Sequence, residues 1–175
     1  VLRPTDLGQD AQALENGYLP LPSVLWDLNG LKLTVEALTH GSVEDSITYA
    51  RYTLANETKS VQKGTFFLAI RPVQVNPPWQ FGGLSTLTSM EYVPAGEWPA
   101  TVKVNGYEQF LSLMPPDGFG ARAFEVGDVM RELAKGELPP DQKLENAGNL
   151  ISGARAYEFE LTPGHSKSVV IAVSE

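Results

Sequence analysis

Residues 24–38, VLWDLNGLKLTVEAL, decide the fold of this chain. In the second half of the stretch, Leu31 and Leu33 alternate with polar side chains, which is the period-two pattern of a strand with one buried face. Asn29-Gly30 separates this run from a strand-like run before it. Both residues of an Asn-Gly pair tolerate positive φ, so the pair predicts a two-residue hairpin turn. The stretch therefore predicts antiparallel β-structure.

The same signals recur along the rest of the chain. Further strands are predicted at residues 45–56, 65–75, 84–93, 101–104, 107–113, 121–126, 154–161 and 167–173. Asn105-Gly106 predicts a second hairpin turn, and Pro163-Gly164 a type II turn. The run at 65–75 is almost continuously apolar, which predicts a strand that is covered on both faces or central in a sandwich.

One short helix is predicted near residues 128–135. Asp128 can cap its start, and Gly136 stands where a left-handed residue often ends a helix. The chain also contains 16 Gly and 13 Pro, more than a helical bundle tolerates. We therefore predict a mostly β fold, an antiparallel β-sandwich with one short helix.

The domain organisation is predicted to be simple. Residues 1–22 are treated as a lead-in arm, and residues 23–175 as a single β-sandwich domain. The chain begins Val1-Leu2-Arg3-Pro4 without an initiator Met, from which we expect a fragment of a longer protein.

Composition restricts the possible partners and chemistry. The formal net charge is −8 and no Lys/Arg cluster is present, so nucleic acid and anionic membrane are not predicted as partners. No apolar run approaches the roughly 20 residues of a membrane helix. The absence of Cys excludes disulfides and thiolate chemistry. It fits a bacterial protein, with a cytoplasmic or an exported location left open.

Motif-like residues favour structural interpretations. The letters Gly-x-Gly-x-x-Ala at residues 118–123 match a dinucleotide fingerprint, but they follow Pro-Pro-Asp and lead into a strand pattern, so we interpret them as a loop. His40 and His165 are predicted at a strand end and in a turn, without the oriented carboxylate that metal or triad chemistry requires.

The acidic residues do not form a recognisable catalytic pair. Glu44 and Asp45 are predicted in a turn, while Glu125 and Asp128 flank the helix start, where carboxylates favour the helix dipole. Glycoside hydrolysis requires two carboxylates at a set separation in space, which sequence spacing does not supply. No catalytic residue, metal ligand or cofactor is predicted.

The most informative segment is residues 71–80, RPVQVNPPWQ. Two prolines stiffen the loop before its aromatic residue, and neighbouring polar groups could bind sugar hydroxyls or peptide carbonyls. The candidate ligand or domain-interface residues are Arg71, Gln74, Asn76, Trp79 and Gln80. Three roles stay open for Trp79: ligand contact, packing against a partner domain and internal packing. Trp26 and Trp98 are predicted as core and loop anchors.

Four stretches carry a resemblance to a known family. They are YxRYxLxN at residues 49–56, GTxFLAIRPxQVNPPWQ at 64–80, PDGFGA at 116–121 and LxPGxSxxV at 161–169. The chain resembles, over about residues 31–173, a segment of large bacterial proteins described as glycoside hydrolases, some of them labelled discoidin-like or coagulation-factor-type. The NPPWQ stretch is fairly specific, whereas the last pattern is generic to β-sandwich modules.

The resemblance implies both a fold and an accessory role. In that family a β-sandwich of the galactose-mutarotase-like supersandwich type precedes an (α/α)6 toroid that carries the catalytic acids. The chain would then be a non-catalytic domain that packs against and shapes the helical catalytic domain of the same polypeptide. Two alternatives stay open: an autonomous carbohydrate-binding module that uses Trp79 or Trp98, and a small mutarotase-like enzyme, which would need a general acid and a general base in one cleft.

Overall fold

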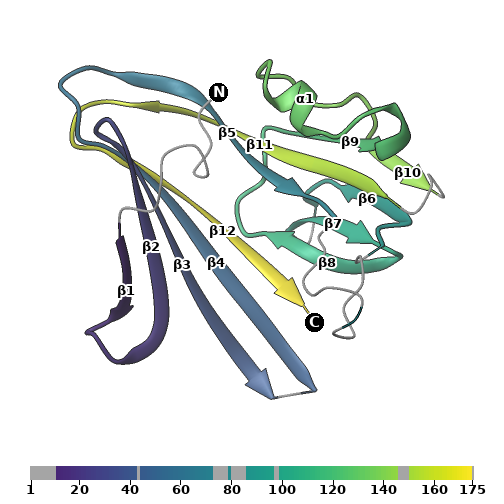
Figure 1. Cartoon of the computed structure of the whole chain (residues 1–175), viewed down its shortest axis with the longest axis horizontal. Coiled ribbons are helices and arrows are strands. Elements are labelled where there is room, and N and C mark those ends of the chain that lie inside the picture. The colour runs from purple at the N-terminus through teal and green to yellow at the C-terminus, as the bar shows by residue number, and fades with distance from the viewer. Residues whose placement is uncertain are drawn as a thin grey trace. The chain divides into compact units, whose positions relative to one another are not determined.

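The computed structural model describes residues 11–42, 44–72, 79, 86–96, 99–145 and 150–174. Its strands, β1 to β12, pair antiparallel, with one 3-10 turn and one short α-helix in the described part (Figure 1). The chain divides into two compact units. We call residues 66–108 and 116–157 the sandwich unit, and residues 2–65, 109–115 and 158–175 the long-sheet unit.

The long-sheet unit is built on long antiparallel hairpins, drawn as the extended arrows β2, β3 and β4 in Figure 1. Its strands are β1 (Ala11–Glu15), β2 (Leu19–Leu28), β3 (Leu31–Ser42), β4 (Asp45–Asn56), β12 (Ser166–Ser174) and the end of β8 (Tyr107–Ser112). They are hydrogen-bonded in the order β1-β2-β3-β4-β12-β8. Asn29 and Gly30 have φ values of 59° and 91°, which confirms the predicted hairpin turn.

The alternation of apolar and polar residues in the sequence places them on opposite faces of the sheet. Trp26, Leu33 and Leu54 stand in register across β2, β3 and β4 and share one face, where the two leucines are buried. Glu36 and Arg51 are paired on the opposite face. The predicted half-buried strand is therefore confirmed.

Asn56 joins three segments at one end of this sheet. Its side-chain amide donates to the carbonyls of Ser60 and Leu161, both at 2.8 Å, and the residue is buried. Its backbone carbonyl accepts from Gly164 N at 2.8 Å. Gly164 has φ of 78°, and His165 N bonds back across the turn, so the predicted Pro-Gly turn is confirmed.

Strands of the sandwich unit belong to two antiparallel sheets. One has the order β5-β11-β9, from β5 (Gln62–Ile70), β11 (Ile151–Leu161) and β9 (Gly118–Ala123). The other joins β7 (Ala100–Val104), β6 (Ser89–Val93) and β10 (Lys143–Glu145). β5 and β11 each continue into the residue ranges of the long-sheet unit. Asn105 and Gly106 have positive φ, which confirms the second hairpin turn.

The two sheets of this unit pack face to face. Met90 and Val102 from one sheet and Ile151 from the other are fully buried. The rings of Tyr92 and Phe119 stack between the sheets with centroids 5.3 Å apart. Two antiparallel sheets that share a buried core form a sandwich-like arrangement, so the predicted fold class is confirmed.

The short helix covers the outer face of the β5-β11-β9 sheet. α1 (Met130–Leu133) follows the 3-10 turn η3 (Phe124–Val126), and its core cluster of Val129, Leu133 and Ala154 packs with Phe67 and Leu138. Asp128 Oδ1 accepts from Met130 N at 2.9 Å, and Gly136 has φ of 80°, as predicted for both ends. The helix is confirmed near residues 128–135, although its regular part is one turn rather than two.

Part of the predicted lead-in arm is regular structure. Residues 11–15 form β1, and β2 begins at Leu19, five residues before the predicted strand. Every residue of β1 is exposed, so hydrophobic alternation does not reveal the strand. Asn16-Gly17, with φ values of 53° and 79°, is the local signal that could have identified this hairpin. Residues 1–10 lie outside the described part.

The apolar run at residues 65–75 is a strand only over its first part. β5 ends at Ile70, and residues 73–75 lie outside the described part. The prediction that both faces are covered is wrong, because Phe66, Phe67 and Leu68 are only half-buried and Ala69 is exposed. β5 ends the order β5-β11-β9, and a strand at that position has a neighbour on one side only.

Candidate functional site

Arg71 ties the end of β5 to the start of α1. It follows Ile70 directly, and its guanidinium forms an ion pair with the carboxylate of Asp128. The Arg71 side chain is exposed and that of Asp128 is half-buried. Asp128 uses its other oxygen to cap α1, so this carboxylate holds both segments. Arg71 therefore has a structural role that its sequence context did not predict.

The other predicted site residues are only partly described. Trp79 is 81% exposed. An indole so accessible to solvent is available for contact with a ligand or a partner domain. Gln74, Asn76 and Gln80 lie outside the described residues, as does Trp98. Trp26, predicted as a core anchor, is half-buried in β2.

Further charged side chains gather beside α1. Arg122 on β9 forms an ion pair with Glu132 on α1, and these side chains are 24% and 13% exposed. Arg131 stands next to Glu132 in the same helix and is exposed. Arg71, Arg122 and Arg131 come from positions up to 60 residues apart, so no sequence pattern identified them as a group.

A short turn with two exposed apolar side chains around one glutamate, Glu125, adjoins this charged cluster. η3 buries none of its residues, and Phe124 and Val126 are 53% and 67% exposed. Gly127 N donates to the carbonyl of Phe124 at 2.9 Å and closes the turn. The sandwich unit thus presents exposed apolar and guanidinium groups on one continuous stretch, residues 124–131.

The glycine fingerprint lies in a strand. Residues 118–123 form β9, so the interpretation as a loop is wrong. A side chain on Gly120 would collide with the carbonyl of Pro139, and Ala121 N donates to the carbonyl of Asp141 at 2.6 Å. The glycine spacing here serves a close approach of two backbone segments rather than a phosphate.

The histidines occupy the predicted kinds of position. His40 is exposed near the end of β3. His165 lies in the Pro-Gly turn, where its Nδ1 is 2.8 Å from Thr162 Oγ1. Within the described residues, no group of three His, Asp or Glu side chains is arranged to hold a metal ion.

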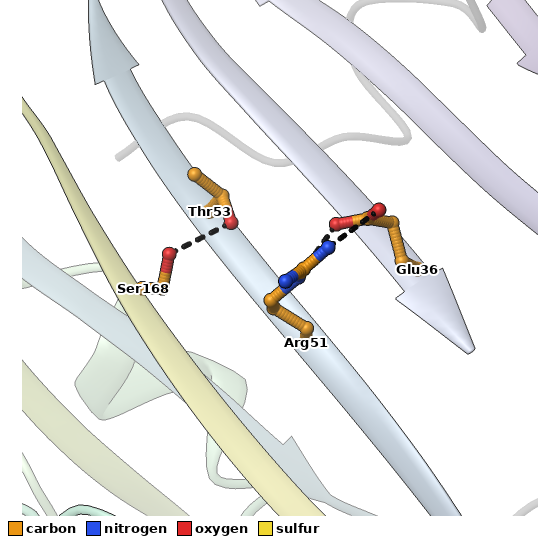
Figure 2. Close-up of polar contacts among 4 residues, drawn as sticks. All are labelled: Glu36, Arg51, Thr53 and Ser168. Carbon is orange, nitrogen blue, oxygen red and sulfur yellow. Dashed lines mark hydrogen bonds and ion pairs between the residues drawn. The ribbon is translucent and has the colours of Figure 1, made fainter. Parts of the chain in front are cut away.

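A polar ladder crosses the long-sheet unit (Figure 2). Arg51 donates from Nε and Nη2 to the two carboxylate oxygens of Glu36, both at 2.8 Å. The Oγ atoms of Thr53 and Ser168 are 2.9 Å apart on the same face. The hydrogen bond from Arg51 lowers the pKa of Glu36, and Glu36 in turn raises the pKa of Arg51. These residues satisfy one another across strands, which stabilises the sheet.

Comparison with known proteins leaves the family open. No protein-family model matches the chain, and no curated protein sequence matches it significantly. Among the described residues, none of the helices has the length and apolar character needed to cross a membrane.

Proposed function

We propose that this chain is a non-catalytic accessory domain of a glycoside hydrolase that packs against a helical catalytic domain of the same polypeptide. The observation that carries the proposal is the pair of exposed apolar side chains on η3, Phe124 and Val126. Apolar groups grouped on a short turn favour contact with a protein partner, because burying them removes apolar surface from water.

The turn is held in place before any partner binds. On one side, Asp128 is fixed by Arg71 and by the α1 backbone. On the other, Phe124 N donates to the carbonyl of Leu150 at 2.8 Å. A preorganised apolar pair loses little conformational entropy on docking, which is the property expected of an interface anchor.

The resemblance supplies the kind of partner. Sandwich domains of that family precede an (α/α)6 toroid, and the toroid carries the catalytic acids. Three residues of the resembling stretches, Asn56, Arg71 and Gly164, have roles in this fold itself. These residues stabilise the fold, and in the proposed role we assign the domain no catalytic residue of its own.

The test uses the full polypeptide that the gene encodes. In it, the double variant Phe124→Ser/Val126→Ser should destabilise the contact and increase amide exchange at residues 124–127, relative to wild type. Tyr18→Ser is the matched control, since Tyr18 is 75% exposed but lies in the long-sheet unit. A polypeptide without a helical domain, or equal exchange in the double variant and wild type, would overturn the proposal.

A second candidate function rests on Trp79. An indole that is 81% exposed can stack on the face of a sugar ring, as a carbohydrate-binding module requires. Trp79→Ala should then abolish binding of soluble polysaccharides in affinity electrophoresis. Tyr107→Ala, at a tyrosine that is 71% exposed, should leave binding unchanged. Equal retardation of wild type and Trp79→Ala would exclude this function.

A further inference from the structure

We propose that Arg122 and Arg131, beside Gly127, form a binding site for the anionic group of an acidic polysaccharide. The anionic group that we propose is the carboxylate of a uronic acid. The saccharide part of this inference rests on the proposed function, whereas the anion site rests on the geometry alone.

One guanidinium beside α1 lies outside the ion pairs of the described residues. Three guanidiniums, those of Arg71, Arg122 and Arg131, face two ion-paired carboxylates, those of Asp128 and Glu132. Within the described chain Arg131 forms no ion pair. Glu125, exposed in η3, is the nearest further acid in sequence and is in no ion pair with these arginines. Arg131 is thus the guanidinium beside α1 that no described carboxylate holds in an ion pair, and Glu125 is the acid that lies exposed in the same stretch.

The two guanidiniums meet at one point. A Cβ built on Gly127 would lie 3.5 Å from Arg131 Nη1 and 3.8 Å from Arg122 Nη1. The two groups carry like charges, and Glu132 forms an ion pair with only one of them, Arg122. An oxyanion at this place would accept from Arg131 and from the second N–H of Arg122 Nη1, an atom that also donates to Glu132 Oε1.

Gly127 keeps the space between the arginines open. Its backbone has φ of 133° and ψ of 154°, a conformation that other residues rarely adopt. Any side chain here would also come within contact distance of both guanidiniums. The residue type and the backbone conformation thus leave room for a ligand group at this place.

The neighbouring aromatic residue suits a sugar better than a free ion. Phe124, 53% exposed, belongs to the same closed turn as Gly127. An exposed aromatic ring in the same turn offers a surface for the C–H face of a pyranose, while the arginines would bind its charged group. The net charge of −8 repels anions from the protein as a whole, so binding should be local and weakened by salt.

The site can be tested by calorimetry with three probes: oligogalacturonate, a neutral cello-oligosaccharide and sodium sulfate. We expect oligogalacturonate to bind, and Arg131→Gln to weaken it about tenfold or more, since a charge-assisted hydrogen bond is lost. Lys135→Gln is the matched control, because Lys135 is an exposed cation just beyond α1 with no place at Gly127. It should bind like wild type.

Each other outcome is decisive. Sulfate binding without oligogalacturonate binding would overturn the saccharide assignment. If Lys135→Gln weakened oligogalacturonate binding as much as Arg131→Gln does, the binding would depend on overall charge and the proposed site would be wrong. Neutral oligosaccharide binding that Arg131→Gln does not affect would also overturn it. Oligogalacturonate binding that depends on Arg131 would support the anion site even if the full polypeptide had no helical domain. Failure of the accessory role and failure of the anion site would therefore give different results. Circular dichroism of both variants verifies that they are folded.

Discussion

The sandwich unit and the long-sheet unit contain similar alternating strands but stabilise them differently. Most buried hydrophobic residues belong to the sandwich unit, where Met90, Val102 and Ile151 are fully enclosed. In the long-sheet unit, Leu38 and Ile47 near the end of the β3–β4 hairpin remain 47% and 37% exposed. The first unit depends on packing between sheets, and the second depends more on strand pairing, turns and cross-strand polar contacts.

The largest expected effect is a cavity in the sandwich unit. Met90→Ala should lower the free energy of unfolding by about 2–5 kcal/mol, because the removed side chain is fully buried between the sheets. Urea denaturation measures the loss, and amide exchange should locate it in β6, β7 and β9. Leu38→Ala, at an exposed position, should cost less than about 0.5 kcal/mol. Similar losses for both variants would contradict the comparison.

The next effect concerns Asn56, which joins three segments at one end of the sheet in the long-sheet unit. Asn56→Ala should cost about 2–3 kcal/mol, because the carbonyl of Leu161 and the amide of Thr58 lose their partners in a buried site. The measurement is again urea denaturation. The control Thr53→Val removes one partly buried contact, to Ser168, and should cost about 1 kcal/mol or less. If Asn56→Ala lowered the free energy of unfolding less than Thr53→Val, the polar contacts at the turns would not be the main stabilising contacts of this unit.

A smaller effect depends on pH. Arg51 lowers the pKa of Glu36 below its ordinary value of 4.5, so the pair stabilises the fold above that pH. The contribution is lost as the pH falls through the lowered pKa of the folded state. Since the pair is exposed, the loss should be about 1 kcal/mol or less and should shrink at high salt. Free energies of unfolding measured from pH 7 to pH 3 should show this loss of stability in wild type and not in Glu36→Gln.

The smallest effect appears only at alkaline pH and concerns Tyr92 in the sandwich unit. Burial raises the pKa of Tyr92 above its ordinary value of 10.0, with a smaller opposing effect from the charge of Arg155. The stability associated with the neutral phenol is therefore present below pH 10 and lost as the pH rises through the raised pKa. Melting temperatures between pH 8 and pH 11 should fall less steeply for Tyr92→Phe. If the melting temperature of Tyr92→Phe fell as steeply with pH as that of wild type, a group other than Tyr92 would cause the alkaline loss of stability.

Local features of the fold were predictable because they depend on adjacent residues. The Asn29-Gly30 and Asn105-Gly106 turns and the strand over residues 45–56 follow from φ preferences and alternation. The hairpin before Leu19 could have been predicted from Asn16-Gly17. Burial of β5 could not, since an apolar run does not reveal whether neighbours cover both of its faces.

The candidate site was predictable only in part. Arg71 and Trp79 stood out by their sequence context, yet the partner of Arg71 is Asp128, on a segment far along the chain. The same holds for Arg122 and Arg131, which only the packing of α1 beside β9 brings to Gly127. Contacts between distant segments leave no periodic pattern in the sequence.

For this protein, the sequence alone determined most of the strands and turns and the short helix, because backbone preference and alternation act over a few residues. Tertiary structure decided which polar residues support the fold, as Asn56 and Arg71 do, and which guanidiniums remain available. The physical reason is that a hydrogen bond or ion pair is defined by distance in space. That distance is set only when β5, β9 and α1 pack together.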